Sequence, residues 1–379
     1  MMSRKQAGFT LMETMVALVI LLGVSAVVMS GMVQMMWTQG TITNRTEMHT
    51  SVRSATELLQ QEIGQAGKMS LPTPPAGVAW AMTSAVAIPG ATGVTTLPAA
   101  TFNVVDALGN PVLYEGEWVT VDTGLNKESV QLTCLAGPGN CPAPSNTWEA
   151  TFYNAHTPAP ILGSGTNGVP ITIPGAFSAG IIPPAAGVMP APPPGYAGYP
   201  DFPAGYPVAP ALNQGSTGTV LKLFGDVNGD GNLVYVEYTC APGTPANPGF
   251  LYRNQVNFWD SLVVPPLDPS MIVLTGVLAN PNDANGNPVP CFNYQLLTKD
   301  GLFAAAHDLA FVTDVAVTLT VQTSNPDPQT HLLQTETKAL LNVSPRNVYD
   351  AWDFATMDYT NRVQPTPPLI KSNILINYQ

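Results

Sequence analysis

Residues 14–44 form a run of 31 positions without a charged side chain, and this run constrains the fold more than any other feature of the chain. At 1.5 Å per residue, a helix from Phe9 to Trp37 would span about 43 Å, which exceeds a hydrocarbon core of ~30 Å. In an ordinary secretory signal peptide, the small-residue cleavage site follows the apolar run. Here the small residue after the basic pair Arg4 and Lys5 is Gly8, ahead of the run. The run would therefore remain in the mature protein as a membrane-spanning helix.

One carboxylate, Glu13, lies at the start of this apolar helix. An ionised carboxylate inside a transmembrane helix costs about 2.5–3.5 kcal/mol on insertion scales and usually has a partner. Cleavage after Gly8 would create such a partner, because the new amine of Phe9 would lie one helical turn from Glu13. The carboxylate would pair with this amine within one subunit, or with the Phe9 amine of a neighbouring subunit in an assembly.

Residues 8–13, with the sequence Gly-Phe-Thr-Leu-Met-Glu, and the apolar run after them resemble the class III signal of type IV pilins and of the pseudopilins of type II secretion. The resemblance implies that a prepilin peptidase cuts after Gly8 and methylates the new N-terminal Phe9. It also implies that Glu13 is the carboxylate used in filament assembly. The alternative is an uncleaved signal anchor in which Glu13 is a stray carboxylate.

Beyond the uncharged run the helix is predicted to continue as an amphipathic segment, so that one helix covers about residues 9–67. Gly23, Gly31 and Gly40 are weak points, because each costs about 1 kcal/mol relative to Ala in a helix interior. Gly67 and the proline-rich segment 71–75 end the helix. Apolar residues recur every three or four positions, which places them on one face: Met48, Val52, Ala55, Leu59, Ile63 and Ala66.

From about residue 100 the pattern changes to the alternation of apolar and polar residues that is typical of strands. A long helix whose apolar stripe lies on an antiparallel sheet buries both apolar faces, so we expect an α+β fold. We also expect the last two of these segments to pair as antiparallel neighbours. The segments are 117–121, 129–134, 148–153, 220–224, 233–238, 271–278, 292–297, 315–322 and 335–343.

A proline-rich stretch interrupts the strand pattern. Fourteen of the 53 residues from 158 to 210 are proline, a density that favours polyproline II and excludes a central strand. We expect an insertion at 158–215, which either contacts a partner or drapes over the domain without order. The predicted organisation is a leader (1–8), the helix (9–67), a linker (68–100), a β-rich head (101–345) and a C-terminal extension (346–379).

A second resemblance concerns the body of the chain. Residues 53–67 are similar to the helix end of PilW-type minor pilins and PulJ-type minor pseudopilins. An Asp/Gly loop between strands, the segment 250–253 and a late Val-rich strand follow in the same order. The length of the chain and the insertion depart from that pattern.

Four cysteines follow the membrane segment, an even number that suggests disulfides in an oxidising compartment. Cys134 and Cys141 bracket a tight Gly/Pro loop, and Cys240 and Cys291 adjoin strand-like runs, so we predict the pairs 134–141 and 240–291. Free buried thiols are the alternative for the second pair. The spacings do not match the paired cysteines of a zinc site.

Residues 226–237 match the calcium-loop pattern D-x-[DN]-x-[DN]-G-x5-E. The flanking segments read as strands rather than the helices of an EF-hand, and a strand would carry Glu237 roughly 16 Å beyond Asn232. The Asn-Gly and Asp-Gly pairs also suit a plain hairpin turn. The candidate Ca²⁺ ligands are Asp226, Asn228, Asp230, the carbonyl of Asn232 and, with less support, Glu237.

Enzymatic and nucleic-acid functions find little support in the sequence. The four histidines (49, 156, 307 and 331) show no metal-binding spacing, each is expected to be a surface or capping residue, and nucleophile-elbow and phosphate-loop motifs are absent. The net charge of −12 repels nucleic-acid phosphates. We therefore expect neither an enzyme nor a direct nucleic-acid binder.

The sequence thus favours a minor pilin or pseudopilin, parked as a single-pass protein in the bacterial inner membrane with a periplasmic head. After cleavage it would assemble with other subunits through the N-terminal helix, at the tip of a filament or in its initiation. The alternatives are a tip-displayed adhesin that uses the Pro/Tyr segment or the calcium loop, and a minor pseudopilin of type II secretion.

Overall fold

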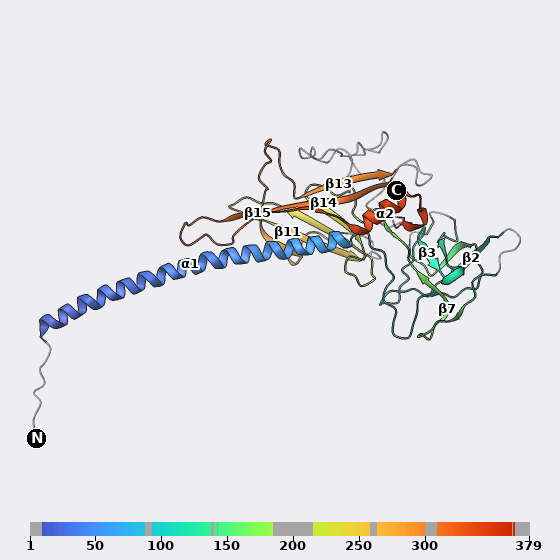
Figure 1. Ribbon diagram of the computed structural model, residues 1–379, viewed down its shortest axis with the longest axis horizontal. Coiled ribbons are helices and arrows are strands. Elements are labelled where there is room, and N and C mark those ends of the chain that lie inside the picture. The colour runs from blue at the N-terminus through green and yellow to red at the C-terminus, as the bar shows by residue number, and fades with distance from the viewer. Residues whose placement is uncertain are drawn as a thin grey trace, which may run out of the picture.

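The computed structural model describes residues 10–87, 93–137, 140–141, 143–184, 215–257, 264–299, 309–365 and 367. Gly8 and Phe9, the middle of the expected insertion (185–214) and most of the C-terminal extension beyond 365 lie outside the described residues. Figure 1 shows one long helix projecting from an elongated head made mostly of strands. The expected α+β class is therefore confirmed.

The long helix α1 (Leu11–Gln65) begins with a capping box at Thr10 and runs without interruption through Gly23, Gly31 and Gly40. Its C-terminal third lies on the main sheet, where it contacts β9, β12, β14 and β15. The sequence-based stripe is confirmed, because each of its members is buried: Met48, Val52, Ala55, Leu59, Ile63 and Ala66.

The main sheet is antiparallel and has seven strands. Six follow the order β13-β14-β12-β11-β10-β9, and the seventh, β15, also pairs with β14. The predicted strands all occur, and the two last ones pair as expected, with Leu319 opposite Lys338. β11 was not predicted as a strand. The bounds are β9 (Val220–Gly225), β10 (Val234–Ala241), β11 (Gly249–Asn257), β12 (Ile272–Leu278), β13 (Phe292–Lys299), β14 (Leu309–Gln322) and β15 (Thr335–Val343).

An ion pair joins α1 to this sheet inside the interface. Glu62 is 6% exposed and accepts hydrogen bonds from Arg253 Nη2 at 2.6 Å and Nε at 2.9 Å. The hydroxyl of Tyr238 donates to the same carboxylate at 2.5 Å. The polar triangle fixes the rotation and the axial position of the helix on β10 and β11.

A second unit follows α1 in the chain and lies beyond its C-terminal end (Figure 1). It consists of a five-stranded sheet, in which β7 pairs with β1, β3 and β6 and β3 pairs with β4, and a hairpin-like pair of β2 and β5. The strands enclose a separate apolar core that includes Phe102, Trp148 and Phe152. The bounds are β1 (Ala81–Met82), β2 (Thr95–Thr101), β3 (Trp118–Val121), β4 (Glu128–Gln131), β5 (Thr147–Phe152), β6 (Ala159–Pro160) and β7 (Asn167–Thr172).

This unit corrects two sequence-based expectations. Residues 68–100, expected to be a linker, contribute β1 and most of β2. The expected insertion begins too early at residue 158, because β7 is a central strand although it contains Pro170. Pro170 has no N–H to donate to the sheet, but its carbonyl still accepts a hydrogen bond from Asp122 N at 2.9 Å, and the neighbouring Ile171 N donates to Trp80 O.

The C-terminal part closes the junction between the two units. Helix α2 (Arg346–Thr356) buries Val348, Ala351 and Ala355, and β16 (Val363–Gln364) pairs in parallel with β8 (Ala176–Phe177). Residues 346–365 are therefore packed elements rather than a simple extension. The Phe177 and Phe224 rings meet edge to face at 4.7 Å beside the end of α1. Three short 3-10 helices complete the described chain: η1 (Gly124–Asn126), η3 (Pro269–Met271) and η4 (Thr360–Arg362).

Candidate functional site

The N-terminal half of α1 is an exposed apolar rod. Its side chains include Leu11 at 77% and Val27 at 74% exposed, although both are strongly apolar. By length and composition it is the one helix of the described residues that qualifies as a membrane span, with a mean hydropathy of 2.6 and none of the most apolar segment buried. The helix of a soluble core would be mostly buried, so this exposure fits an apolar environment outside the chain.

Glu13 is engaged at the first turn of this rod. Its Oε2 accepts a hydrogen bond from Thr10 N at 2.9 Å and from Thr10 Oγ1 at 3.1 Å, and its own N–H faces Thr10 Oγ1 at 3.4 Å. This is a capping box, in which the side chains at the N-cap and N3 positions satisfy each other's free N–H groups. The carboxylate is thereby held at the positive end of the helix dipole. Its pairing with the Phe9 amine stays a prediction.

A comparison with protein families matches the same segment. Residues 3–32 fit the family model described as the prokaryotic N-terminal methylation motif. This N-terminal motif supports a type IV pilin-like protein. The motif implies processing by a prepilin peptidase and assembly with other pilin subunits, with Gly8, Phe9 and Glu13 inside the matched segment. No curated protein and no solved structure matches the chain significantly, and the specific PilW or PulJ type is not supported by these comparisons.

Where α1 leaves the head, it contacts the loop 323–334 between β14 and β15, which we call the collar. Asn44 Nδ2 donates to the carbonyls of Asn325 and Pro326, and Arg45 Nε donates to Gln334 Oε1 at 2.5 Å. A Cβ placed on Gly40 would lie 2.8 Å from Pro328 Cγ, so the glycine permits this close approach. The exposed rod of α1 ends at the collar.

The predicted calcium residues fall into two groups. Asp226, Asn228, Asp230 and Asn232 all lie in the loop between β9 and β10. Glu237 lies on β10, where the hydroxyl of Tyr235 donates to it at 2.8 Å and Lys222 Nζ is 3.8 Å away. Glu237 therefore has partners on the strands, which agrees with its lower rank among the candidate Ca²⁺ ligands in the sequence analysis.

Asp226 is the most enclosed member of this loop. Its Oδ2 accepts hydrogen bonds from Lys68 Nζ at 2.8 Å and Ser70 Oγ at 2.5 Å. Burial raises the pKa of Asp226, but these bonds and the nearby backbone N–H of Gly231 lower it by more. The pKa of Asp226 is therefore below its ordinary value. The carboxylate is therefore ionised at neutral pH. Calcium binding itself stays a prediction at this point.

Both predicted disulfides form, Cys134–Cys141 and Cys240–Cys291. The carboxylate of Glu115 lies close to the first pair and accepts a hydrogen bond from Cys141 N at 3.1 Å. Because both sulfur atoms are consumed in the disulfide, this cluster does not supply the thiolates of a metal site.

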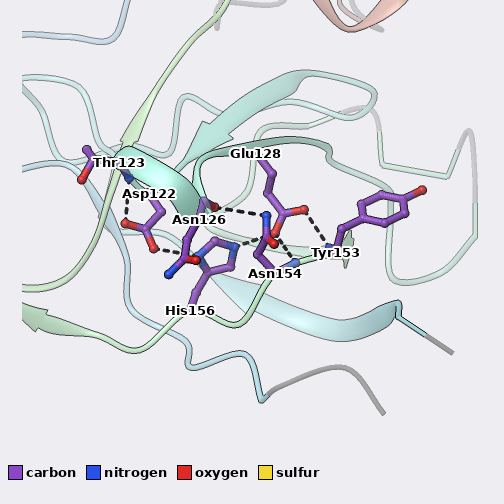
Figure 2. Close-up of polar contacts among 7 residues, drawn as sticks. All are labelled: Asp122, Thr123, Asn126, Glu128, Tyr153, Asn154 and His156. Atoms are coloured by element: carbon purple, nitrogen blue, oxygen red, sulfur yellow. Dashed lines mark hydrogen bonds and ion pairs between the residues drawn. The ribbon is translucent and has the colours of Figure 1, made fainter. Parts of the chain in front are cut away.

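A buried charged cluster in the second unit was missed by the sequence reading (Figure 2). His156, expected at the surface, is fully buried. Its Nδ1 lies 3.0 Å from Asp122 Oδ2, and its Nε2 lies 2.6 Å from Glu128 Oε1. Glu128 also accepts backbone N–H groups of Tyr153 and Asn154. Both ring nitrogens are engaged by carboxylates, so the cluster ties strands together and leaves no nitrogen for a general base.

No sequence signal could have revealed this cluster, because its members come from three separate segments. Asp122 follows β3 with a positive φ of 69°, Glu128 begins β4, and His156 lies after β5. Among the other histidines, His49 Nδ1 lies 2.6 Å from Glu336 Oε2 at the surface of α1, and His331 lies in the exposed collar. His307 lies outside the described residues.

Proposed function

We propose that this protein is a minor pilin or pseudopilin that is inserted in the bacterial inner membrane, processed after Gly8 and assembled into a type IV pilus-like filament through α1. The observation that carries the proposal is the exposed apolar rod of α1 that bears the matched methylation motif at its N-terminus. A rod of this kind suits a lipid environment before assembly and helix–helix packing after it.

The head supports a periplasmic location. Both disulfides lie in it, and disulfides form and persist in the oxidising periplasm or on the cell surface. With one candidate span among the described residues, at the N-terminus, the simplest topology is single-pass. A structural subunit of this kind needs no catalytic centre, so the proposal includes no enzymatic activity.

The position of the second unit supports a tip or initiating role. The unit extends the head beyond the C-terminal end of α1, on the side away from the N-terminus (Figure 1). In a filament whose helices stack along one axis, that space is taken by the next subunit in the direction of growth. A subunit at the tip has no such neighbour, so the bulky unit can be accommodated there.

Processing is tested first by intact-mass and N-terminal analysis of the protein produced with and without an active prepilin peptidase. We expect a mature chain that starts at methylated Phe9 only when the peptidase is active. A chain that starts at Met1 or Met2 under both conditions contradicts the proposal and favours a plain signal anchor.

Assembly is tested with Glu13→Ala, which should leave membrane insertion intact but strongly reduce incorporation into sheared filaments. Glu57→Ala is the matched control, because Glu57 is a glutamate of the same helix that forms only an exposed pair with Arg53. Equal incorporation of the two variants would refute the role of Glu13.

A further inference from the structure

Three loops of the described chain, which begin at Asp106, Asp226 and Asp283, contain glycine and asparagine, and two of them are closed turns. In the exposed loops that begin at Asp106 and Asp283, Oδ1 accepts two backbone N–H groups and Oδ2 accepts the side chain of the asparagine four residues on. Each of these carboxylates is satisfied by its own loop. These loops are therefore turns that need no ligand.

The loop that begins at Asp226 differs in this respect. Asp226 is fully buried, Oδ2 is held by Lys68 and Ser70, and Oδ1 is buried with no hydrogen-bond partner among the described residues. The backbone N–H of Gly231, in the same loop, lies near this carboxylate but forms no hydrogen bond with Oδ1. A buried acceptor without a partner destabilises the fold, and more so when it is charged. A bound cation would remove this cost.

The rest of the loop presents oxygen atoms toward solvent. Asn228 and Asp230 are exposed, and the Asn232 N–H donates to Asp230 Oδ1 at 2.9 Å, which curls the chain back at this point. Asp226 and Asp230 together carry two negative charges against the single positive charge of Lys68. The net charge of these three side chains is −1, so the loop attracts cations.

We propose that residues 226–232 bind one Ca²⁺ through Asp226 Oδ1, the side-chain oxygens of Asn228 and Asp230, and the carbonyl of Asn232. Water completes the six to eight oxygen ligands that Ca²⁺ takes, because the outer side of the loop is open. The flexible geometry of mixed carboxylate, amide and carbonyl ligands suits Ca²⁺ better than Mg²⁺, which demands a near-ideal octahedron. A dissociation constant of about 10⁻⁴–10⁻³ M is expected, as in extracellular modules.

The location gives the ion a structural consequence. The loop is attached to the end of α1, because Asp226 N donates to Lys68 O at 2.9 Å and Gly67 N donates to Phe224 O at 2.8 Å. A Cβ on Gly231 would collide with Leu71 O, so the loop also packs closely against the chain that leads into the second unit. Ca²⁺ would therefore stabilise the joint of the helix, the main sheet and the second unit.

The test is isothermal titration of the full-length protein in detergent with CaCl₂, together with its melting temperature in Ca²⁺ and in chelator. We expect saturable one-to-one binding and a higher melting temperature in Ca²⁺. In Asp230→Asn, binding should weaken at least about tenfold because one ligand charge is lost. The asparagine oxygen still accepts the Asn232 N–H, so this variant should melt like the wild type in chelator.

Asp283→Asn is the matched control, because it makes the same change in an exposed loop whose carboxylate is already satisfied. It should bind Ca²⁺ like the wild type. The proposal is overturned if the wild type shows no saturable binding and no Ca²⁺-dependent melting, if Asp230→Asn binds normally, or if both variants lose binding. None of these outcomes depends on whether the protein is cleaved or assembled.

Discussion

The ion pair between α1 and the main sheet leads to a quantitative prediction. Glu62→Ala removes a carboxylate that Arg253 grips with two nitrogen atoms and leaves the hydroxyl of Tyr238 without its acceptor. Removal of one partner from a buried ion pair costs about 3–5 kcal/mol. The Arg253 side chain is 20% exposed and regains some hydration, so we expect the lower end, a loss of about 3 kcal/mol in the free energy of unfolding.

Urea unfolding in detergent, followed by circular dichroism of the sheet, measures this loss. Glu57→Ala is the control on the same helix, because its partner Arg53 is 80% exposed and such surface pairs contribute little to stability. The denaturant slope should stay unchanged in both variants. If Glu62→Ala cost no more than Glu57→Ala, the claim that the buried pair fixes the helix on the sheet would be refuted.

A double-mutant cycle separates the pair from the effect of truncation. Arg253→Met keeps most of the apolar stem of the side chain while removing the charge. The coupling energy between Glu62→Ala and Arg253→Met should reach about 2 kcal/mol, within the range for contacting residues. A coupling energy near zero would mean that packing, rather than charge, holds this part of the interface.

Three further predictions concern the head. Burial raises the pKa of Glu117 well above its ordinary value, so this residue stabilises the fold below its unfolded pKa and loses that contribution as pH rises through the folded pKa. Glu117→Gln stays neutral and should melt at a higher temperature than the wild type at about pH 8. If the difference in melting temperature between variant and wild type did not change with pH, the prediction would be wrong. His156→Ala leaves two carboxylates without their shared partner and should cost about 3 kcal/mol in urea unfolding, whereas a cost below about 1 kcal/mol would contradict the cluster's structural role. The disulfide Cys240–Cys291 spans a sequence separation of 51, so by loop length its loss in Cys240→Ser should cost about 4 kcal/mol of stability. Cys134–Cys141 spans a separation of 7, and its loss in Cys134→Ser should cost about 2 kcal/mol. If Cys134→Ser lowered the unfolding midpoint more than Cys240→Ser, the loop-entropy argument would be refuted.

The features that could be predicted from the sequence are those that repeat locally or depend on neighbouring residues. The stripe from Met48 to Ala66 follows the helical period, and the alternation in β14 and β15 follows the strand period. The helix face, the two strands and their antiparallel pairing could therefore be predicted. The close pair Cys134 and Cys141 was readable from the tight loop between them. The methylation motif is a contiguous signal, and the family comparison matched it independently.

The features that were missed depend on contacts between distant segments. Nothing near Pro170 indicates that its strand would be central, because the segments that pair with this strand, near 80–81 and 120–122, are distant in the sequence. His156 looked like an isolated surface residue because its two carboxylates are 28 and 34 residues away in sequence. Composition also suggested a linker at 68–100, where short strands gain their stability from pairing rather than from their own sequence.

The collar has a mechanical consequence. In Figure 1 the axis of α1 runs roughly along β14 and β15, and the loop that joins these two strands grips the helix at Asn44 and Arg45. A pull on the N-terminal rod, as when a subunit is drawn from a bilayer or a fibre is stretched, would therefore load the hairpin along its length. The hydrogen bonds that join β14 to β12 and β13 would then resist together in shear, instead of opening one after another as they would under a force that peels the strands apart.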